Sequence, residues 1–351
     1  MTGKEYVEEL KKNCGKWIRI NLEETLNYRK QQLKKFNCSD KELERLDQIY
    51  RDNNALEAYI QKLYKDIYYF LPKDAQEKLK DVYIGVLDTF NVNASAIMNN
   101  SKCDTPVVIL HGQLLAVISQ FAELQVLIAY YDDKIQELIR SFHEIIDCYL
   151  YQNYAIRLPV LESNLSEEQS LQVGLNTVFY EVFIILHELA HIYLGHLDTS
   201  GSEILYLNNE EKIFIHQNNK KKEFEADAKA MKWMVQMLRN ENCTLPLRIY
   251  RMNEFICFEL FYLFHIFDYK ANRLDELKKL DNPHRILRVS QNVDNIISVN
   301  DNSCIGYPLS IERLLNLITV CTEENYFNEE QVGWIVTHFY TELVVFEELG
   351  I

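Results

Sequence analysis

Glycine and proline are scarce in this sequence, with 10 Gly and 6 Pro among 351 residues. These two residues supply tight turns and interrupt regular elements, so their scarcity favours long helices over short strands joined by turns. Internal repeats and low-complexity segments are also missing from the sequence. Apolar residues make up 48% of the chain, which is typical of a globular protein with a substantial core. We therefore predict a globular, mostly helical protein.

Positive charge is also in short supply. The chain has 37 Lys and Arg against 52 Asp and Glu, which gives a formal net charge of −15 at pH 7. A nucleic-acid interface needs a concentrated basic surface, and the only compact basic run is residues 220–222. We therefore expect no nucleic-acid partner.

Signals for secretion, disulfide bonding and membrane insertion are absent as well. None of the 8 cysteines belongs to a C-x-x-C pair, and a chain of this length does not need disulfides to fold. Residues 1–17 lack the apolar core of a signal peptide. The apolar regions 106–131 and 255–267 contain polar side chains, and the second is too short to span a bilayer. We expect a cytoplasmic protein with no membrane partner.

One apolar stretch, residues 181–196, contains an H-E-x-x-H motif that runs from His187 to His191. On a helix these two histidines lie about 40° apart, so both imidazoles can bind one Zn²⁺ from the same side. Glu188 lies next to that face, within reach of a water molecule at the metal. Zinc lowers the pKa of such a water, and a carboxylate can take its proton. The motif therefore predicts metal-assisted hydrolysis.

The flanking residues favour a metal site over histidines that only pack in a core. Residues 182–186 and 192–194 are apolar, so we predict that the helix is buried. Two histidines and a glutamate carry a desolvation penalty there unless they have partners. Gly195 is typical of the residue that ends such a helix.

A second motif lies downstream, at the start of a predicted helix over residues 222–238. Glu223 and Asp227 are one turn apart on the same face of this helix. Glu225 is about 200° from Glu223, so we expect it to point elsewhere. The competing interpretation is a solvated helix start, because acidic residues favour the first turn.

The order H-E-x-x-H and then E-x-x-x-D resembles the gluzincin metalloproteases. The resemblance implies a Zn²⁺ ion held by His187, His191 and Glu223, with Asp227 orienting His187 or His191. It also implies an α+β fold, mostly α, with a zincin-like core and a small β-sheet or hairpin beside the metal helix. The metzincin pattern does not fit. On a continued helix His196 would lie about 140° from His191, so we predict a structural role or a contact after the helix.

A weaker resemblance covers residues 281–289, which are similar to the H-P-x-x-x-x-R element of prenyl-protease-type gluzincins. Asn282 stands where that element has histidine. The resemblance implies that His284 stabilises the oxyanion and that Arg285 or Arg288 binds a substrate carboxylate. The alternative is a loop followed by the start of a helix. The other candidate oxyanion donors are Tyr250, Tyr262 and His265.

The chain divides into two predicted parts. Residues 1–100 are predicted to be a helical N-terminal region, in which a helix follows Pro72 and includes Leu79, Val82, Val86 and Phe90. A polar segment, residues 91–104, predicts the boundary. Residues 101–351 are then predicted to form the zincin-like metalloprotease domain.

Several smaller elements are predicted within the second part. Ser166 to Gln169 form a capping box that predicts a short helix before the metal helix. The predicted strands are residues 107–110 and 154–161, with a β-hairpin over residues 204–216. The further predicted helices are residues 255–267, 309–323 and 328–347. Glu259 and His265 in the first of these need partners, either near the metal site or in the core.

The resemblance covers roughly residues 170–290 and includes soluble bacterial ImmA/IrrE-type and Lit-type peptidases. It implies a zinc-dependent endopeptidase that hydrolyses an intracellular protein or peptide, in phage defence or stress regulation. The helical region ahead of the zinc motifs is closer to the Lit type. Two alternatives remain open from the residues alone: a non-catalytic interaction module stabilised by zinc, and an acidic helical scaffold without metal.

Overall fold

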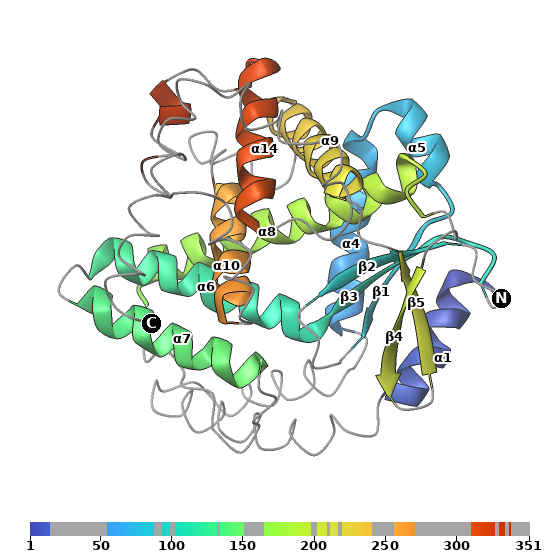
Figure 1. Cartoon of the computed structure of the whole chain (residues 1–351), viewed down its shortest axis with the longest axis horizontal. Coiled ribbons are helices and arrows are strands. Elements are labelled where there is room, and N and C mark those ends of the chain that lie inside the picture. The colour runs from blue at the N-terminus through green and yellow to red at the C-terminus, as the bar shows by residue number, and fades with distance from the viewer. Residues whose placement is uncertain are drawn as a thin grey trace. The chain divides into compact units, whose positions relative to one another are not determined.

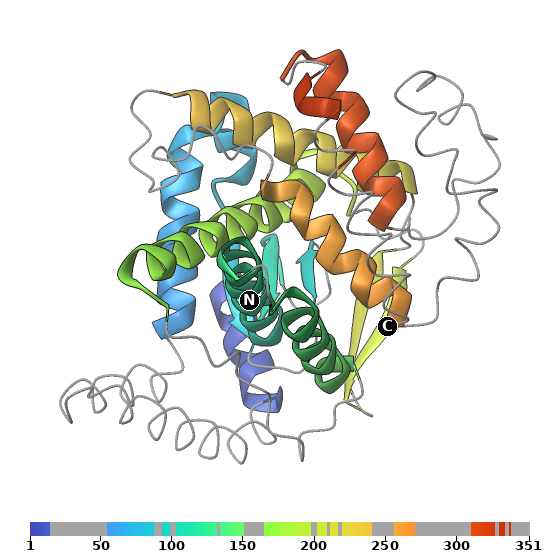
Figure 2. The same ribbon diagram turned by 90° about the vertical axis from the view of Figure 1, so that its left-hand side faces the viewer.

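The structure is a computed structural model of the chain. It describes residues 1–14, 55–87, 93–98, 103–131, 134–150, 165–197, 202–208, 211–216, 220–240, 256–270, 310–326, 330–333 and 337. Helices predominate and a small sheet accompanies them, so the predicted α+β, mostly α class is confirmed (Figures 1 and 2).

The chain forms two compact units. Met1–Leu115 and Leu197–Ile215 make up the first unit, and Ala116–His196 and His216–Ile351 make up the second. The predicted domains, residues 1–100 and 101–351, stay a prediction.

The first unit contains a three-stranded sheet in the order β1-β3-β2. β3 (Val107–His111) lies in the centre, parallel to β1 (Tyr83–Leu87) and antiparallel to β2 (Ala94–Ile97). Every residue of β3 is buried, as expected for an uninterrupted apolar run in a central strand. The strand predicted over residues 107–110 is thus confirmed.

The helix predicted to run from Leu79 towards Phe90 is wrong. α5 (Lys73–Leu79) ends at Leu79, and β1 begins at Tyr83. The apolar residues there match a helical period, but the segment is rich in β-formers and pairs with β3 along its whole length. Pairing with a distant strand therefore overrides the local pattern. The predicted helical region contains two strands, β1 and β2, and Phe90 lies outside the described residues.

Two helices, α1 (Gly3–Cys14) and α4 (Ala55–Phe70), pack against β1. Two side chains of α4 also form hydrogen bonds with the backbone of β1 at its free edge. The Glu57 carboxylate accepts a hydrogen bond from the Val86 N–H at 3.1 Å, and the Gln61 amide donates to the Ile84 carbonyl at 3.2 Å. These contacts satisfy backbone groups that would otherwise be unpaired at an edge strand.

Gly85 of β1 lies against Val7 of α1. A Cβ atom at Gly85 would come 2.6 Å from Val7 Cγ1, which is closer than carbon atoms approach. We expect Gly85→Ala to lower the free energy of unfolding by about 1–3 kcal/mol through overpacking, measured by urea denaturation. Gly174→Ala is the control, because a Cβ there meets nothing within 4 Å and alanine favours a helix. An unchanged midpoint for Gly85→Ala would contradict the close packing.

The second unit is helical in its described residues. Its helices are α6 (Gly112–Tyr130, which begins in the first unit), α7 (Ile135–Leu150), α8 (Glu167–Tyr193), α9 (Lys220–Arg239), α10 (Ile256–Lys270) and α14 (Ser310–Glu323). α9 packs along α8, α10 packs against α7, α8 and α14, and α14 also contacts α9 (Figures 1 and 2). The helices predicted over residues 222–238, 255–267 and 309–323 are thereby confirmed.

α8 carries the H-E-x-x-H motif and has a defined start and end. The side chain of Ser166 accepts from the Gln169 N–H and the Gln169 side chain bonds back to Ser166, so the predicted capping box is confirmed. It opens one 27-residue helix instead of a separate short one. Gly195, with a φ of 71°, ends the helix as predicted. The amides of Gly195 and His196 bond back to the carbonyls of Ile192 and His191 at 3.2 and 3.0 Å, a Schellman motif.

Two helices, α6 and α8, are long and apolar enough to pass a length and composition test for a membrane span. Of the most apolar segment of each helix, 78% is buried inside the protein in α8 and 50% in α6. Buried core helices of soluble proteins have the same length and composition. The expected absence of a membrane partner stays a prediction.

The predicted hairpin over residues 204–216 is confirmed as a two-stranded sheet of β4 (Ser202–Asn208) and β5 (Glu211–His216). All but the last residue of these strands belong to the first unit, so their predicted place beside the metal helix stays a prediction. Further predictions fall outside the described residues: the strand over residues 154–161, the element over residues 281–289 and most of the helix over residues 328–347.

Candidate metal centre

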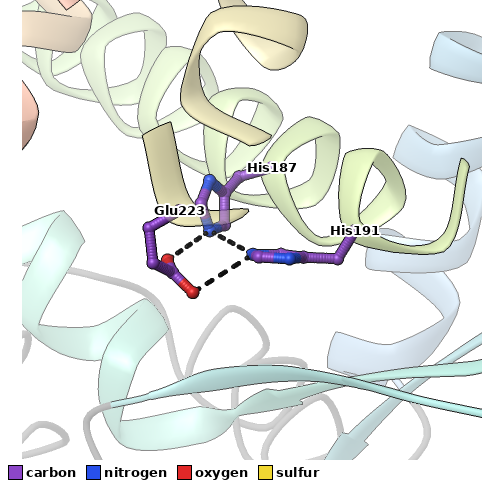
Figure 3. Close-up of side chains that lie close together, drawn as sticks. All are labelled: His187, His191 and Glu223. Carbon is purple, nitrogen blue, oxygen red and sulfur yellow. Dashed lines mark hydrogen bonds and ion pairs between the residues drawn. The ribbon is translucent and has the colours of Figure 1, made fainter. Parts of the chain in front are cut away.

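The two histidines of the H-E-x-x-H motif point the same way from buried turns of α8 (Figure 3). His187 Nε2 and His191 Nε2 lie 3.0 Å apart. Their rings are nearly perpendicular, at 81°, so the two nitrogens converge while the ring faces stay apart. The one-turn spacing in the sequence therefore produces the convergence that a shared metal ion requires.

Glu223 reaches the same point from the first turn of α9 (Figure 3). Its Oε2 lies 3.3 Å from His187 Nε2, and its Oε1 lies 3.5 Å from His191 Nε2. Ligands about 2.0–2.1 Å from a tetrahedral zinc ion are about 3.3 Å from one another. One donor atom from each of the three side chains lies within 4.8 Å of the others, so the two imidazoles and the carboxylate could hold a zinc ion together.

Asp227, one turn after Glu223, holds the first histidine. Its Oδ1 lies 2.9 Å from His187 Nδ1, so of the two histidines that the motif allowed, His187 is its partner. A proton on Nδ1 leaves the Nε2 lone pair for a metal. Burial alone lowers the pKa of His187, but the charge of Asp227 and the hydrogen bonds to Asp227 and Glu223 raise it to about 9. A metal ion must displace that second proton, because it binds neutral imidazole.

Arg313 of α14 is a member of the site that the sequence reasoning missed. Its Nε and Nη2 donate to the two carboxylate oxygens of Asp227 at 2.8 and 2.6 Å, a bidentate pair. Burial raises the pKa of Asp227, but the charge of Arg313 and its hydrogen bonds outweigh that effect and hold the pKa below its usual value. The guanidinium also lies 5.5 Å from the centre of the Phe261 ring.

The only signal for Arg313 in the sequence is a basic residue in an apolar helix start, SIERLL. It lies 86 residues from Asp227, so no local spacing connects the two. Only 5% of its surface is exposed, and a buried guanidinium requires a buried anion. Burial of Arg313 would therefore have predicted an acidic partner, but not which acidic residue it is.

Glu188, the candidate proton acceptor, is buried next to His187 on α8. Burial raises the pKa of its carboxyl group, while the neighbouring His187 and His191 act in the opposite direction. Across the part of the chain that the structure describes, its carboxylate forms no hydrogen bond or ion pair. A carboxylate in that state is available to exchange a proton with a reacting group.

His196 contacts the cluster of His187, His191 and Glu223, and Glu225 contacts His196. His196 Nδ1 lies 3.1 Å from His191 Nδ1, and His196 Nε2 lies 3.0 Å from Glu225 Oε2. Burial and the charge of His191 lower the pKa of His196 to about 4 against the opposing effect of Glu225. As predicted, Glu225 points away from the cluster that Glu223 enters.

The other predicted site residues that the structure describes belong to α10. Tyr262 and His265 are buried on α10, and Glu259 is half-buried there. The remaining predicted contacts lie outside the described residues: Tyr250, His284, Arg285 and Arg288. The assignment of the oxyanion donor and of the substrate-carboxylate contact stays a prediction.

Among the described residues, His187, His191 and Glu223 form the only group of His, Cys, Asp or Glu side chains arranged to hold a metal ion. No curated protein and no solved structure matches the chain. A family model described as peptidase U49 matches residues 123–317, which is more than half of the 351 residues. The match includes all the cluster's residues and Arg313. The chain therefore belongs to the peptidase U49 family.

Proposed function

We propose that this protein is a zinc-dependent endopeptidase of the H-E-x-x-H type that hydrolyses peptide bonds of a protein substrate. The observation that carries the proposal is the convergence of His187 Nε2, His191 Nε2 and the Glu223 carboxylate beside the buried Glu188. Membership of a peptidase family supports the same chemistry.

His187, His191 and Glu223 would hold the zinc ion, and Asp227 keeps His187 in the tautomer that binds it. A bound zinc ion would polarise the scissile carbonyl and lower the pKa of the attacking water. Glu188 would take a proton from that water and give it to the leaving nitrogen. Each of these roles falls to a side chain that the two motifs place in one buried cluster.

The alternative from another class is an interaction module stabilised by structural zinc. Structural sites are closed by four protein ligands, whereas catalytic sites keep one position open. Within the described ranges the cluster offers three ligands, and the neighbouring Glu188 is not one of them. Both observations favour the catalytic site.

Metal removal distinguishes these functions. We expect the purified full-length protein to contain about one zinc ion per chain. Chelation should abolish cleavage of an unstructured protein while changing the circular dichroism spectrum little, and added zinc should restore cleavage. Loss of the folded spectrum on chelation would indicate the structural module. A protein without stoichiometric metal would exclude both zinc functions and favour the metal-free scaffold.

The natural substrate can be sought by comparing cleaved peptides in cells that express the wild type or Glu188→Gln. New protein termini that depend on Glu188 would identify both the substrate and the bond. The cytoplasmic location and a role in phage defence or stress regulation stay predictions, and this comparison tests them through the identity of the substrate.

A further inference from the structure

A chain of two contacts leads away from the proposed zinc site on the side of His191. Its Nδ1 lies 3.1 Å from Nδ1 of His196, whose Nε2 lies 3.0 Å from Oε2 of Glu225. The His196 side chain is 7% exposed and that of Glu225 is 45% exposed. A buried imidazole therefore connects a candidate metal ligand to a partly exposed carboxylate.

The order of these contacts determines where the protons lie. Nε2 of His191 faces Glu223 and would bind the metal, so the Nδ1 atom of the neutral ring carries the proton. That N–H donates to Nδ1 of His196, which must be unprotonated to accept it. The proton of His196 then lies on Nε2 and is donated to Glu225. In the other tautomer of His196, two N–H groups would face each other.

We propose that His196 and Glu225 are positioning residues for the metal ligand His191, and that Glu225 acts only through His196 by selecting its Nε2–H tautomer. The inference rests on the proposed zinc site. It gives His191 the kind of support that Asp227 gives His187: a hydrogen bond that fixes the ring and leaves Nε2 free for the metal.

The backbone around His196 is built to hold this contact. The left-handed conformation of Gly195, with a φ of 71°, turns the chain back towards the helix end. Nζ of Lys222 donates to the carbonyl oxygen of His196 at 2.8 Å. The first two turns of α9 thus hold the backbone of His196 through Lys222 and its side chain through Glu225, while Glu223 enters the cluster.

Zinc affinity of the purified full-length protein, measured by competition with a chromophoric chelator, tests the inference without using activity. We expect His196→Ala to weaken zinc binding about 10–100-fold, as for other residues that orient a metal ligand. Glu225→Ala should weaken it by a smaller factor, roughly 3–10-fold. Without Glu225, both tautomers of His196 are populated, and only the Nε2–H tautomer can accept the hydrogen bond from His191.

Two combined variants show whether Glu225 acts through His196 or independently of it. His196→Ala with Glu225→Ala should bind zinc no more weakly than His196→Ala alone, because Glu225 acts through His196. His196→Asn should stay within about threefold of the wild type, because an amide oxygen can replace Nδ1 as the acceptor and has no tautomers. In that background Glu225→Ala should have no further effect.

Lys221→Ala is the control, because Lys221 is a solvent-exposed cation 3.9 Å from Glu225 and should not affect zinc binding. If His196→Ala does not fold, His196→Asn and Glu225→Ala carry the test. Zinc affinity within about twofold of the wild type in His196→Ala, or a Glu225→Ala effect that persists with His196→Asn, overturns the inference. A wild type that binds no zinc overturns the proposed function instead.

Discussion

Glu188→Gln is expected to reduce the turnover number for peptide cleavage about 10²–10⁴-fold, the usual range for loss of a general base. Glutamine has nearly the same shape as glutamate but cannot take a proton from water. Glu188 is not one of the three converging ligands, so the zinc content and the melting temperature should stay close to those of the wild type. Turnover can be measured on a substrate identified in cells or on an unstructured protein.

Glu168→Gln is the matched control for this variant. It removes the same charge from the same helix, α8, but at an exposed position in the first turn. Turnover by this variant should equal that of the wild type. A zinc-loaded Glu188→Gln protein that cleaves at the wild-type rate would rule out Glu188 as the base, whatever the metal does.

Arg313→Met is expected to lower the free energy of unfolding by about 3–5 kcal/mol, measured by urea denaturation of the metal-free protein. The side chain of Asp227 is 0% exposed and loses both hydrogen bonds from the guanidinium in this variant. Asp227 then keeps only its contact with His187 at 2.9 Å, so the desolvation penalty of its buried carboxylate is less fully compensated, and methionine fills most of the space without supplying charge.

Two controls show whether the effect belongs to the buried pair. Arg313→Met combined with Asp227→Asn should recover part of the lost stability, because the buried carboxylate and its desolvation penalty are removed as well. Lys232→Met breaks the exposed pair with Glu324, whose side chains are 41% and 48% exposed, and should cost about 1 kcal/mol or less. A loss for Arg313→Met as small as that for Lys232→Met would contradict the role assigned to the buried pair.

Local spacing was sufficient to predict which side chains of each motif share a helix face. The four-residue spacing of His187 and His191, and that of Glu223 and Asp227, placed each pair on one helix face without knowledge of the fold. The way that Glu223 approaches both imidazoles depends on how α9 packs along α8. The resemblance to gluzincins supplied that information, and the residues of either motif alone did not.

Local spacing failed where the chain changes direction or pairs with a distant segment. The contact after the helix that was predicted for His196 is confirmed, but the angle of about 140° assumed a continued helix and could not identify His191 as the partner. Gly195 ends the helix, and the Schellman motif brings His196 back to His191. Likewise the apolar residues of β1 match a helical period, and the pairing with β3 that makes this segment a strand cannot be seen in the local sequence. Arg313 was missed for the same reason, since its anion belongs to another helix.

The bidentate contact between α14 and α9 has a consequence for biosynthesis. A nascent chain that ends before Ser310 already contains both zinc motifs but lacks the guanidinium that neutralises Asp227. His187 then depends on a carboxylate that lacks the two hydrogen bonds from Arg313. The site of this peptidase-family protein should therefore be fully assembled only after Arg313 of α14, 86 residues beyond Asp227, has been synthesised.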